Sequence, residues 1–241
     1  MRKPPTNEIN VRQALEWAVN RDAIVKTVFG PYQSLGAMTP AYANLGEINW
    51  GYEKKAGEIY KYDPVKAKQL LEEAGWKEGP GGIRQKNGQN LEIALGTWEN
   101  GVVEVLQAQL RDIGVDLKIQ VAPVVATNEA ARREQINMAP LPGIRNDPDA
   151  LSSYHTRNRA GAEFTFHENP KLDDLLDAGA TAPSNEERLK IYSEIQMMMM
   201  QNAMYLPIFR RDSVLGARAE VEGLVLDRGQ FAILYDTYMR K

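Results

Sequence analysis

The sequence predicts an α/β fold, and three consecutive segments carry this prediction. Residues 91–97 and 115–121 alternate apolar and polar side chains, as half-buried strands do. Between them, residues 101–113 place apolar side chains at helical spacing, and Gly114 is positioned to end that helix. A strand, a helix and a second strand in this order favour a right-handed crossover. We therefore expect the two strands to be parallel neighbours or near neighbours in one sheet.

The N-terminal segment predicts two short helices followed by an irregular region. Asn10 and Gln13 have the spacing of a capping pair for the first helix. Asn20 is expected to cap a second helix that ends at Phe29. Residues 31–61 are rich in glycine, proline and aromatic residues and show no clear period. This pattern predicts a long aromatic loop, which is either functional or packs its rings over the core.

A third helix is predicted over residues 64–74. Asp63 provides an N-cap, and the following proline suits the first helical position. The apolar stripe of this helix includes Leu70 and Leu71, which we expect to pack on the sheet. Gly75 is placed to close the helix in a left-handed conformation.

Turn-forming residues separate the elements that follow. Residues 79–82 and 86–89 are turn signals that bracket short strands. A helix is predicted at 127–135, with Thr127 as its N-cap, and a short strand at 136–139.

The last strong helix prediction begins at Ser184, which forms a capping box with Glu187. This helix runs into a methionine run at 197–200. Methionines at four successive positions point around the whole helix, so they indicate a buried helix end rather than a soft-metal or peptide contact. Residues 205–209 predict a strand, with Pro207 favouring an edge or a bulge.

The composition excludes several classes of protein. The net charge is −3 and the basic residues are dispersed, so no nucleic-acid partner is expected. A run of about eighteen apolar residues, which a transmembrane helix needs, is absent from the sequence. The first residues lack the apolar core of a signal peptide. The chain contains no cysteine, which excludes disulfides and thiolate metal sites.

Few residues suggest catalysis. His155 and His167 are the two histidines, and the sequence contains no nucleophile, Walker or zinc-protease motif. Asp147 and Asp149, with Glu163 and His167, form a conceivable acid–base or metal set. An Asp-Pro-Asp sequence is more often a turn in which a carboxylate accepts backbone N–H groups. We therefore expect no enzyme activity, no metal and no cofactor.

Four segments, in order along the chain, resemble one family. They include the strings VRQAL near the start, YDPVKAKQLLEEAGW around the third helix, and DPD followed by a capped helix. The segments are 10–25, 62–76, 82–91 followed by 107–115, and 146–150 followed by 169–176. Together they resemble the extracellular solute-binding proteins of ABC importers, family 5, which capture peptides, nickel and some sugars.

This resemblance implies a fold and an organisation. The fold is a lobe of the periplasmic-binding-protein type II class, with a mixed sheet flanked by helices. Residues 1–210 correspond to the second, C-terminal lobe, and residues 211–241 to a tail that returns to a first lobe. That first lobe is expected to be missing from this chain. Apolar surface in the loop 31–61 and in the tail is then expected to be exposed and to favour self-association.

The resemblance also implies a function without catalysis. The two lobes would close on a small solute, a peptide or an oligosaccharide, and deliver it to an ABC transporter permease. The full-length parent would be periplasmic or extracellular and anchored to the membrane. Two alternatives remain open: an enzyme or sensor domain that reuses the same lobe, or a module that only contacts the permease.

The ligand cleft of such a protein is expected over the carboxyl ends of the sheet strands, where loops and helix N-termini meet. The candidate ligand-binding residues are Tyr32, Trp98, Glu99, Asn100, Arg145, Asn146, Asp147 and Asp149. Trp98 offers an apolar platform beside polar groups, or simply packs on the next helix. Peptide-binding relatives carry a tryptophan and an aspartate before the DP pair, and some carry an arginine near residue 101. Neither feature is present here, which argues against a peptide.

Overall fold

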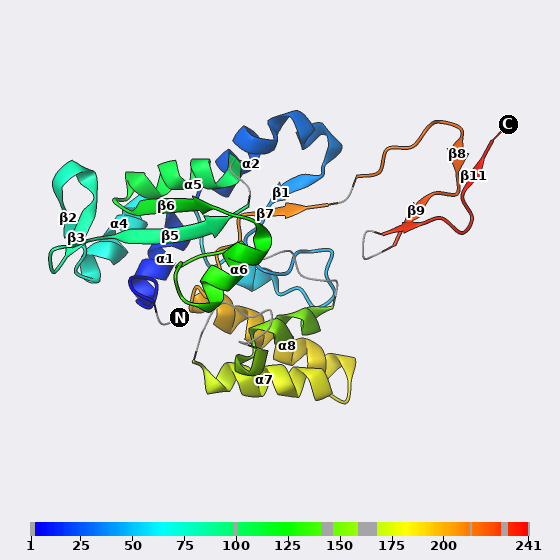
Figure 1. Cartoon of the computed structure of the whole chain (residues 1–241). Helices are drawn as coiled ribbons and strands as arrows, with labels where there is room; N and C mark the ends of the chain where they lie inside the picture. Colours follow the sequence, from blue (N-terminus) through cyan, green and yellow to red (C-terminus); the bar gives the residue numbers. More distant parts are fainter. Residues whose placement is uncertain are drawn as a thin grey trace.

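The computed structural model describes residues 3–98, 101–140, 147–158, 168–212, 214–227 and 231–240. Figure 1 shows a sheet with helices around it, a group formed by α7 and α8 away from that sheet, and a tail that runs outward beyond β7. The α-helices are α1 (Ile9–Ala18), α2 (Arg21–Phe29), α3 (Lys54–Gly57), α4 (Pro64–Glu73), α5 (Gly101–Asp112), α6 (Val124–Arg132), α7 (Pro170–Thr181) and α8 (Asn185–Gln201). The 3-10 helices are η1 (Gly30–Leu35), η2 (Pro80–Gly82), η3 (Pro148–Tyr154) and η4 (Thr156–Asn158).

The strands form short pairs around one parallel pair. They are β1 (Met38–Pro40), β2 (Lys77–Glu78), β3 (Arg84–Lys86), β4 (Gln89–Asn90), β5 (Glu92–Thr97), β6 (Asp116–Val121), β7 (Phe209–Arg211), β8 (Val221–Glu222), β9 (Val225–Leu226), β10 (Ala232–Ile233) and β11 (Tyr238–Met239). β5 and β6 pair in parallel from Glu92 opposite Asp116 to Thr97 opposite Val121, with α5 between them in sequence. The predicted strand–helix–strand unit is therefore confirmed.

The far side of β5 meets the segment predicted as a strand at 136–139. Met138 forms an isolated parallel bridge with Leu95, and its carbonyl accepts the Gly96 N–H at 3.0 Å. The segment thus continues the sheet, but only as a single bridge.

The main hydrophobic core lies between this sheet and the helices α1, α4 and α5. Leu71 is fully buried and Leu70 nearly so, which confirms the inward face predicted for α4. The main neighbour of α4 is α1, and both helices share one core cluster with β5 and β6. Gly75 adopts a φ of 86°, as the predicted left-handed helix end requires.

Three of the predicted N-caps are confirmed. Asn20, Asp63 and Ser184 each accept a backbone hydrogen bond from the first turn of their helix, at 2.9, 2.9 and 3.2 Å. Two were misplaced. The first helix begins at Ile9, and the side chain of Gln13 donates to the carbonyl of Gln201 instead of capping.

The second correction concerns α6. This helix begins at Val124 after Pro123, three residues earlier than predicted. Thr127 lies inside it, and its hydroxyl donates to the carbonyl of Ala122 at 3.3 Å. The start of the helix is hard to recognise in the sequence, because the valines on either side of Ala122 and Pro123 continue the apolar pattern of β6.

The region 31–61 is not one long loop. It contains η1, the strand β1 and the short helix α3. β1 pairs antiparallel with β7, which occupies 209–211 rather than the predicted 205–209. The strand begins later than predicted because the residues before it bind elsewhere. The guanidinium of Arg21 donates a hydrogen bond to the carbonyl of Pro207 at 2.8 Å, so this carbonyl is not part of a strand ladder. Arg21 is itself buried and paired with buried Glu16.

A second core cluster lies between α7, α8 and η3. Tyr192, Met199, Leu172 and Leu151 are fully buried in it. Met200 is fully buried in a third cluster beside Tyr60, whereas the other two methionines of the run are half-buried. The methionine run is therefore a packed helix end, as predicted.

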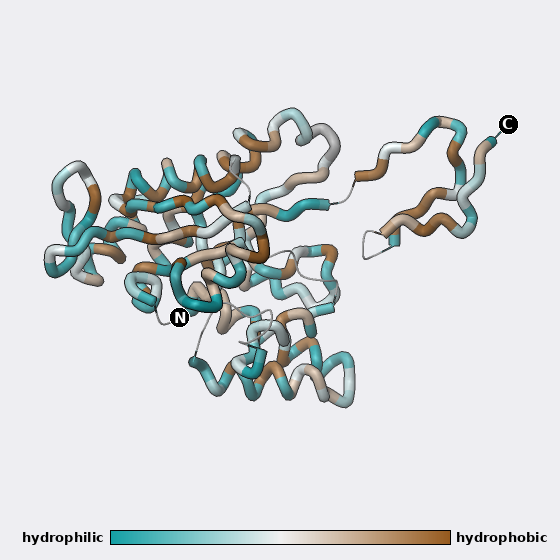
Figure 2. The backbone as a smooth tube through the Cα atoms, viewed as in Figure 1, coloured by the Kyte–Doolittle hydropathy of each residue, from teal (hydrophilic) through white to brown (hydrophobic). Residues whose placement is uncertain are grey.

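The tail carries two antiparallel strand pairs, β9 with β10 and β8 with β11. Figure 2 shows hydrophobic stretches along these strands. Large apolar side chains are exposed there, including Phe231 (73%) and Tyr235 (93%). Exposed apolar surface in the tail was expected from the sequence. None of the described helices combines the length and the apolar character needed to cross a bilayer.

Candidate ligand-binding edge

The carboxyl ends of β5 and β6 form one edge of the sheet, which we name the carboxyl edge. Thr97 and Val121 are opposite each other, so both strands end at the same level. The next helix after each strand starts at this edge, α5 at Gly101 and α6 at Val124. Open edges of this kind, where parallel strands end and helices begin, are common ligand sites in α/β proteins.

Close packing behind the edge fixes its shape. A Cβ atom at Gly96 would lie 2.6 Å from Cδ1 of Ile136 and 3.0 Å from Cγ2 of Thr127. The sheet therefore tolerates only glycine here without movement, because α6 and the 136–138 segment press on β5 from one side.

Two aromatic candidates belong to this side of the molecule. Trp98 directly follows β5 and is half-buried. A Cβ at Gly101 would lie 3.2 Å from Cγ1 of Val28, so the end of α2 abuts the start of α5. Tyr32 lies in η1, which continues from α2, and it is 56% exposed. Glu99, Asn100, Arg145 and Asn146 lie outside the described residues.

Sequence reasoning missed an apolar patch at the carboxyl edge. Val121, Val124 and Val125 are 61%, 44% and 80% exposed. They follow one another where β6 ends and α6 begins. The signal was present in the VAPVV string, which continues an apolar pattern beyond the point where the strand can be buried.

The other two candidates, Asp147 and Asp149, form the predicted turn. Oδ1 of Asp147 accepts the N–H of Asp149 at 2.8 Å, which caps η3. Both carboxylates also reach α8. Arg188 donates to the two oxygens of Asp147 at 3.1 and 2.7 Å, and the hydroxyl of Tyr192 donates to Asp149 at 2.9 Å.

These contacts set the electrostatics of the turn. Burial by itself raises the pKa of Asp147, but hydrogen bonds from Arg188 and from the Asp149 N–H outweigh it and hold the pKa below its ordinary value. The Arg188 guanidinium also lies over the rings of Trp50 and Tyr192, at 5.2 and 5.3 Å from their centroids. Arg188 and Trp50 were not among the candidate ligand-binding residues; Trp50 was expected only as one aromatic residue of the region 31–61.

His155 belongs to a separate polar cluster. Its Nδ1 accepts the N–H of Arg157 at 3.1 Å, and its Nε2 lies 3.3 Å from Asp177. Hydrogen bonds from Arg157 and then from His155 lower the pKa of Asp177. Across the described residues, no three histidine or acidic side chains are grouped in a way that would hold a metal ion. These groups stabilise η3 and η4 against α7.

Small-molecule sites are commonly lined by aromatic and apolar side chains with a few polar groups. Residues 1–163 match the model of the bacterial extracellular solute-binding proteins, family 5, middle region, and the chain belongs to this family. The family comprises solute-binding proteins rather than enzymes.

Curated relatives support the same assignment. The chain is 33% identical to the nickel-binding periplasmic protein of Escherichia coli over 222 residues, covering 86% of this chain and 40% of the relative. It is 28% identical to the dipeptide-binding protein of Escherichia coli over 243 residues, covering 94% of this chain and 42% of the relative. The chain therefore spans about two-fifths of the length of these relatives.

A solved structure confirms the predicted fold. The oligopeptide-binding protein AppA of Bacillus subtilis, solved with a nonapeptide, superimposes with a TM-score of 0.71 at 23% identity. The match covers 99% of this chain and 46% of that structure.

Proposed function

We propose that this chain supplies the second lobe of an extracellular or periplasmic solute-binding protein, which captures a small solute and delivers it to the permease of an ABC importer. The carboxyl edge would form one wall of the binding cleft. The observation that carries this proposal is the edge itself: an open strand end with a half-buried tryptophan and exposed valines, in a chain that belongs to this family.

The opposite wall would come from a first lobe outside this chain. The chain covers about two-fifths of its relatives, so the proposal concerns a larger protein. We assign residues 1–210 to the second lobe and residues 211–241 to a tail that packs on the first lobe. The exposure of Phe231 and Tyr235 supports this assignment, because such rings are usually covered. Membrane anchoring of the full-length parent stays a prediction.

We propose different roles for the candidate residues. Trp98 and Tyr32 would contact the solute directly, because both carry rings at or near the carboxyl edge and neither is fully buried. Asp147 and Asp149 would act by holding their turn against α8, since their carboxylates are engaged by Arg188 and Tyr192. The remaining candidate contacts are Glu99, Asn100, Arg145 and Asn146.

The solute is proposed only as a class. The relatives differ in what their names state, nickel in one and a dipeptide in another. We propose a peptide or an oligosaccharide, with a nickel complex as a further probe. A peptide would bind without the tryptophan and aspartate that peptide-binding relatives carry before the DP pair. A cleft built from aromatic and apolar side chains with a few polar groups suits each of these.

Calorimetry tests the proposal. The full-length parent protein, the 241-residue chain alone, and the chain mixed with the preceding region of the parent are titrated with dipeptides, oligopeptides, an oligosaccharide and nickel–histidine. We expect binding by the parent and the mixture, and little binding by the chain alone. Trp98→Ala should weaken binding about tenfold or more, whereas Trp50→Phe, which changes a ring stacked on Arg188 instead, should leave it nearly unchanged.

One result would replace this proposal. If the chain alone binds one of these solutes at micromolar affinity, in a pocket enclosed by its own residues, a two-lobed clamp is not required. A self-contained sensor or enzyme domain would then be the better interpretation.

A further inference from the structure

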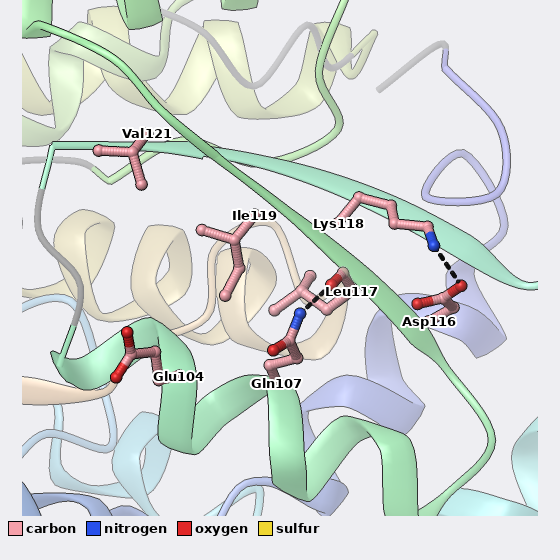
Figure 3. Close-up of a pocket in the computed structure, with 7 residues that line it drawn as sticks. All are labelled: Glu104, Gln107, Asp116, Leu117, Lys118, Ile119 and Val121. Carbon is pink, nitrogen blue, oxygen red and sulfur yellow. Dashed lines mark hydrogen bonds and ion pairs between the residues drawn. The ribbon is translucent and has the colours of Figure 1, made fainter.

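A groove runs along the outer edge of β6, on the side away from β5. Its volume is about 490 Å³, and Figure 3 shows the residues that line it. These residues are Asp116, Leu117, Lys118, Ile119 and Val121 of β6, and Glu104 and Gln107 of α5. The groove is separate from the residues proposed above to contact the solute, although Val121 belongs to both surfaces.

The hydrogen-bonding groups of β6 alternate between its two sides. The N–H groups of Asp116 and Ala122 donate to carbonyls on the β5 side, at Leu91 and Thr97. In a parallel pair, the intervening residues therefore direct their N–H and C=O groups outward. Leu117, Ile119 and Val121 are these residues.

The contacts on the α5 side leave most of this outer edge available. The side chain of Gln107 donates to the carbonyl of Leu117 at 2.6 Å, which holds α5 against one end of the strand. Ile119 and Val121 point into the groove (Figure 3), and Val121 is 61% exposed. Over the described residues, the structure pairs β6 with β5 alone.

The edge carries few of the devices that keep edge strands apart. Natural proteins protect such edges with proline, bulges, very short strands or charged side chains, lysine above all. β6 is six residues long and its register with β5 is regular. Its single lysine, Lys118, is neutralised by Asp116 at 2.7 Å, with Glu92 at 4.0 Å.

We propose that this groove receives the same strand of a second copy of the chain, paired antiparallel across a two-fold axis. Ile119 of one copy would lie opposite Ile119 of the other, and Leu117 opposite Val121. The apolar side chains of both copies would then meet on the α5 side of one continuous sheet. The exposed Val121 would gain an apolar neighbour.

Charge and hydrogen bonding select both the occupant and the register. In the proposed register Lys118 faces the uncharged Gln120, and the outward N–H and C=O groups of both strands face each other. The Leu117 carbonyl, which already accepts from Gln107, would accept the second strand with its other lone pair. A shift of two residues in one direction would place Lys118 against Lys118 of the other copy, which is unfavourable. The opposite shift would place Leu117 against Pro123, which has no N–H to donate. β6 is thus complementary to itself in one register. An interface made by one short strand from each copy is small, so we expect the dimer to be weak and reversible.

A cysteine cross-link tests the register, because the natural chain contains no cysteine. In a hydrogen-bonded antiparallel pair the Cα atoms are about 5.5 Å apart, within the range that a disulfide spans. Ile119→Cys should therefore form a reducible covalent dimer on mild oxidation. Val65→Cys, at a 75% exposed position on α4, is the matched control and should link at least fivefold less.

Two blocking variants complete the test in the Ile119→Cys background. Val121→Pro removes one outward N–H without removing a hydrogen bond to β5, as prolines on edge strands do. Val121→Lys leaves the backbone intact and places a charge against Leu117. Circular dichroism confirms that each variant folds, and both should reduce dimer formation by fivefold or more. The proposal would be wrong if Ile119→Cys cross-links no more than the Val65→Cys control, or if its cross-linking persists in both blocking variants. Association through the exposed tail would then be the better explanation of any dimer.

Discussion

The β5–β6 pair and the strands of the tail are both apolar strand pairs but have opposite surroundings. β5 and β6 alternate inward apolar residues with other side chains, whereas β9 and β10 each place two apolar residues in succession. In the first pair, Ile93 and Leu117 are buried to 0% and 1% exposure beneath helices. In the tail, Val225 and Ile233 are exposed to 56% and 46% in an antiparallel pair that none of the described helices covers.

This difference shows that the formation of a strand and the burial of its apolar face have separate causes. Apolar and β-branched residues allow a segment to form a strand with an apolar face. Burial of that face requires a second element with its own apolar stripe, such as α5 or α1. The tail has the first property, and among its described residues nothing supplies the second. The predictions below test whether the sheet region carries the stability of the chain and the tail carries almost none.

The largest effect is expected from the core. Leu71→Ala removes a fully buried side chain and should lower the free energy of unfolding by about 2–5 kcal/mol. Leu234→Ala, at a 63% exposed position in the tail, should change it by less than about 0.5 kcal/mol. Urea denaturation measures both. Equal effects would show that the tail is packed in solution.

A second contrast uses two glycines. Gly96→Ala forces a methyl group to within 2.6 Å of Ile136 and should destabilise the chain by about 1–3 kcal/mol. Gly216→Ala, in the tail, meets no atom within 4 Å and should be nearly neutral. Thermal denaturation is a suitable measurement. Ile136→Val in the Gly96→Ala background should recover part of the loss; an absence of recovery would place the strain elsewhere.

The third contrast concerns ion pairs. Arg188→Met breaks a bidentate pair with Asp147 and two ring contacts, and should lower stability by about 1 kcal/mol. The pair between Arg240 and Glu222 in the tail, 3.1 Å apart, is more exposed, so Arg240→Met should change stability by only a few tenths of a kcal/mol or less.

The pH dependence of the Arg188 contribution has a definite sign. The pKa of Asp147 is lower in the folded chain than in the unfolded one. Its stabilisation is therefore fully present above the unfolded value of 3.8 and is lost as the pH falls through the folded value. The difference between the native chain and Arg188→Met should shrink as the pH falls from 6 toward 2. A constant difference would assign it to ring packing alone.

The smallest effect is expected from removing the tail. A variant ending at Asp212 should unfold within about 0.5 kcal/mol of the complete chain. It should also bind much less of a dye specific for exposed apolar surface, because Phe231, Leu234 and Tyr235 are removed. Dye fluorescence and urea titration measure the two quantities. A large loss of stability would mean that the tail supports the rest of the chain.

The elements with local signals were predictable from the sequence. Asp63 and Ser184 mark helix starts because their side chains bond backbone N–H groups a few residues away. β5 and β6 were predictable because each alternates over its whole length. α6 was misplaced because its first valines extend the apolar pattern of β6, and Thr127 is a plausible cap that the structure uses inside the helix.

Features that depend on distant residues were not predictable. β1 forms where its partner β7 lies more than a hundred residues along the chain, and no local pattern indicates that pairing. The role of Arg188 was hidden for the same reason, since its carboxylate partner is 41 positions away. For the candidate site, the turn at Asp147 was predicted from its own three residues. The exposure of Val121, Val124 and Val125 depends on where the neighbouring helices leave space.

The contacts of the N-terminal helices bear on synthesis of the chain. Arg12 donates to the carbonyl of Asn202, 190 positions later, and Arg21 donates to that of Pro207, 186 positions later. α1 and α2 are therefore translated well before the residues that bind these two arginines. Until those residues have been made, both arginines lack these hydrogen bonds and the helices are incompletely held. If the parent protein is exported as proposed above, this delay keeps the segment unfolded for longer before it crosses the membrane.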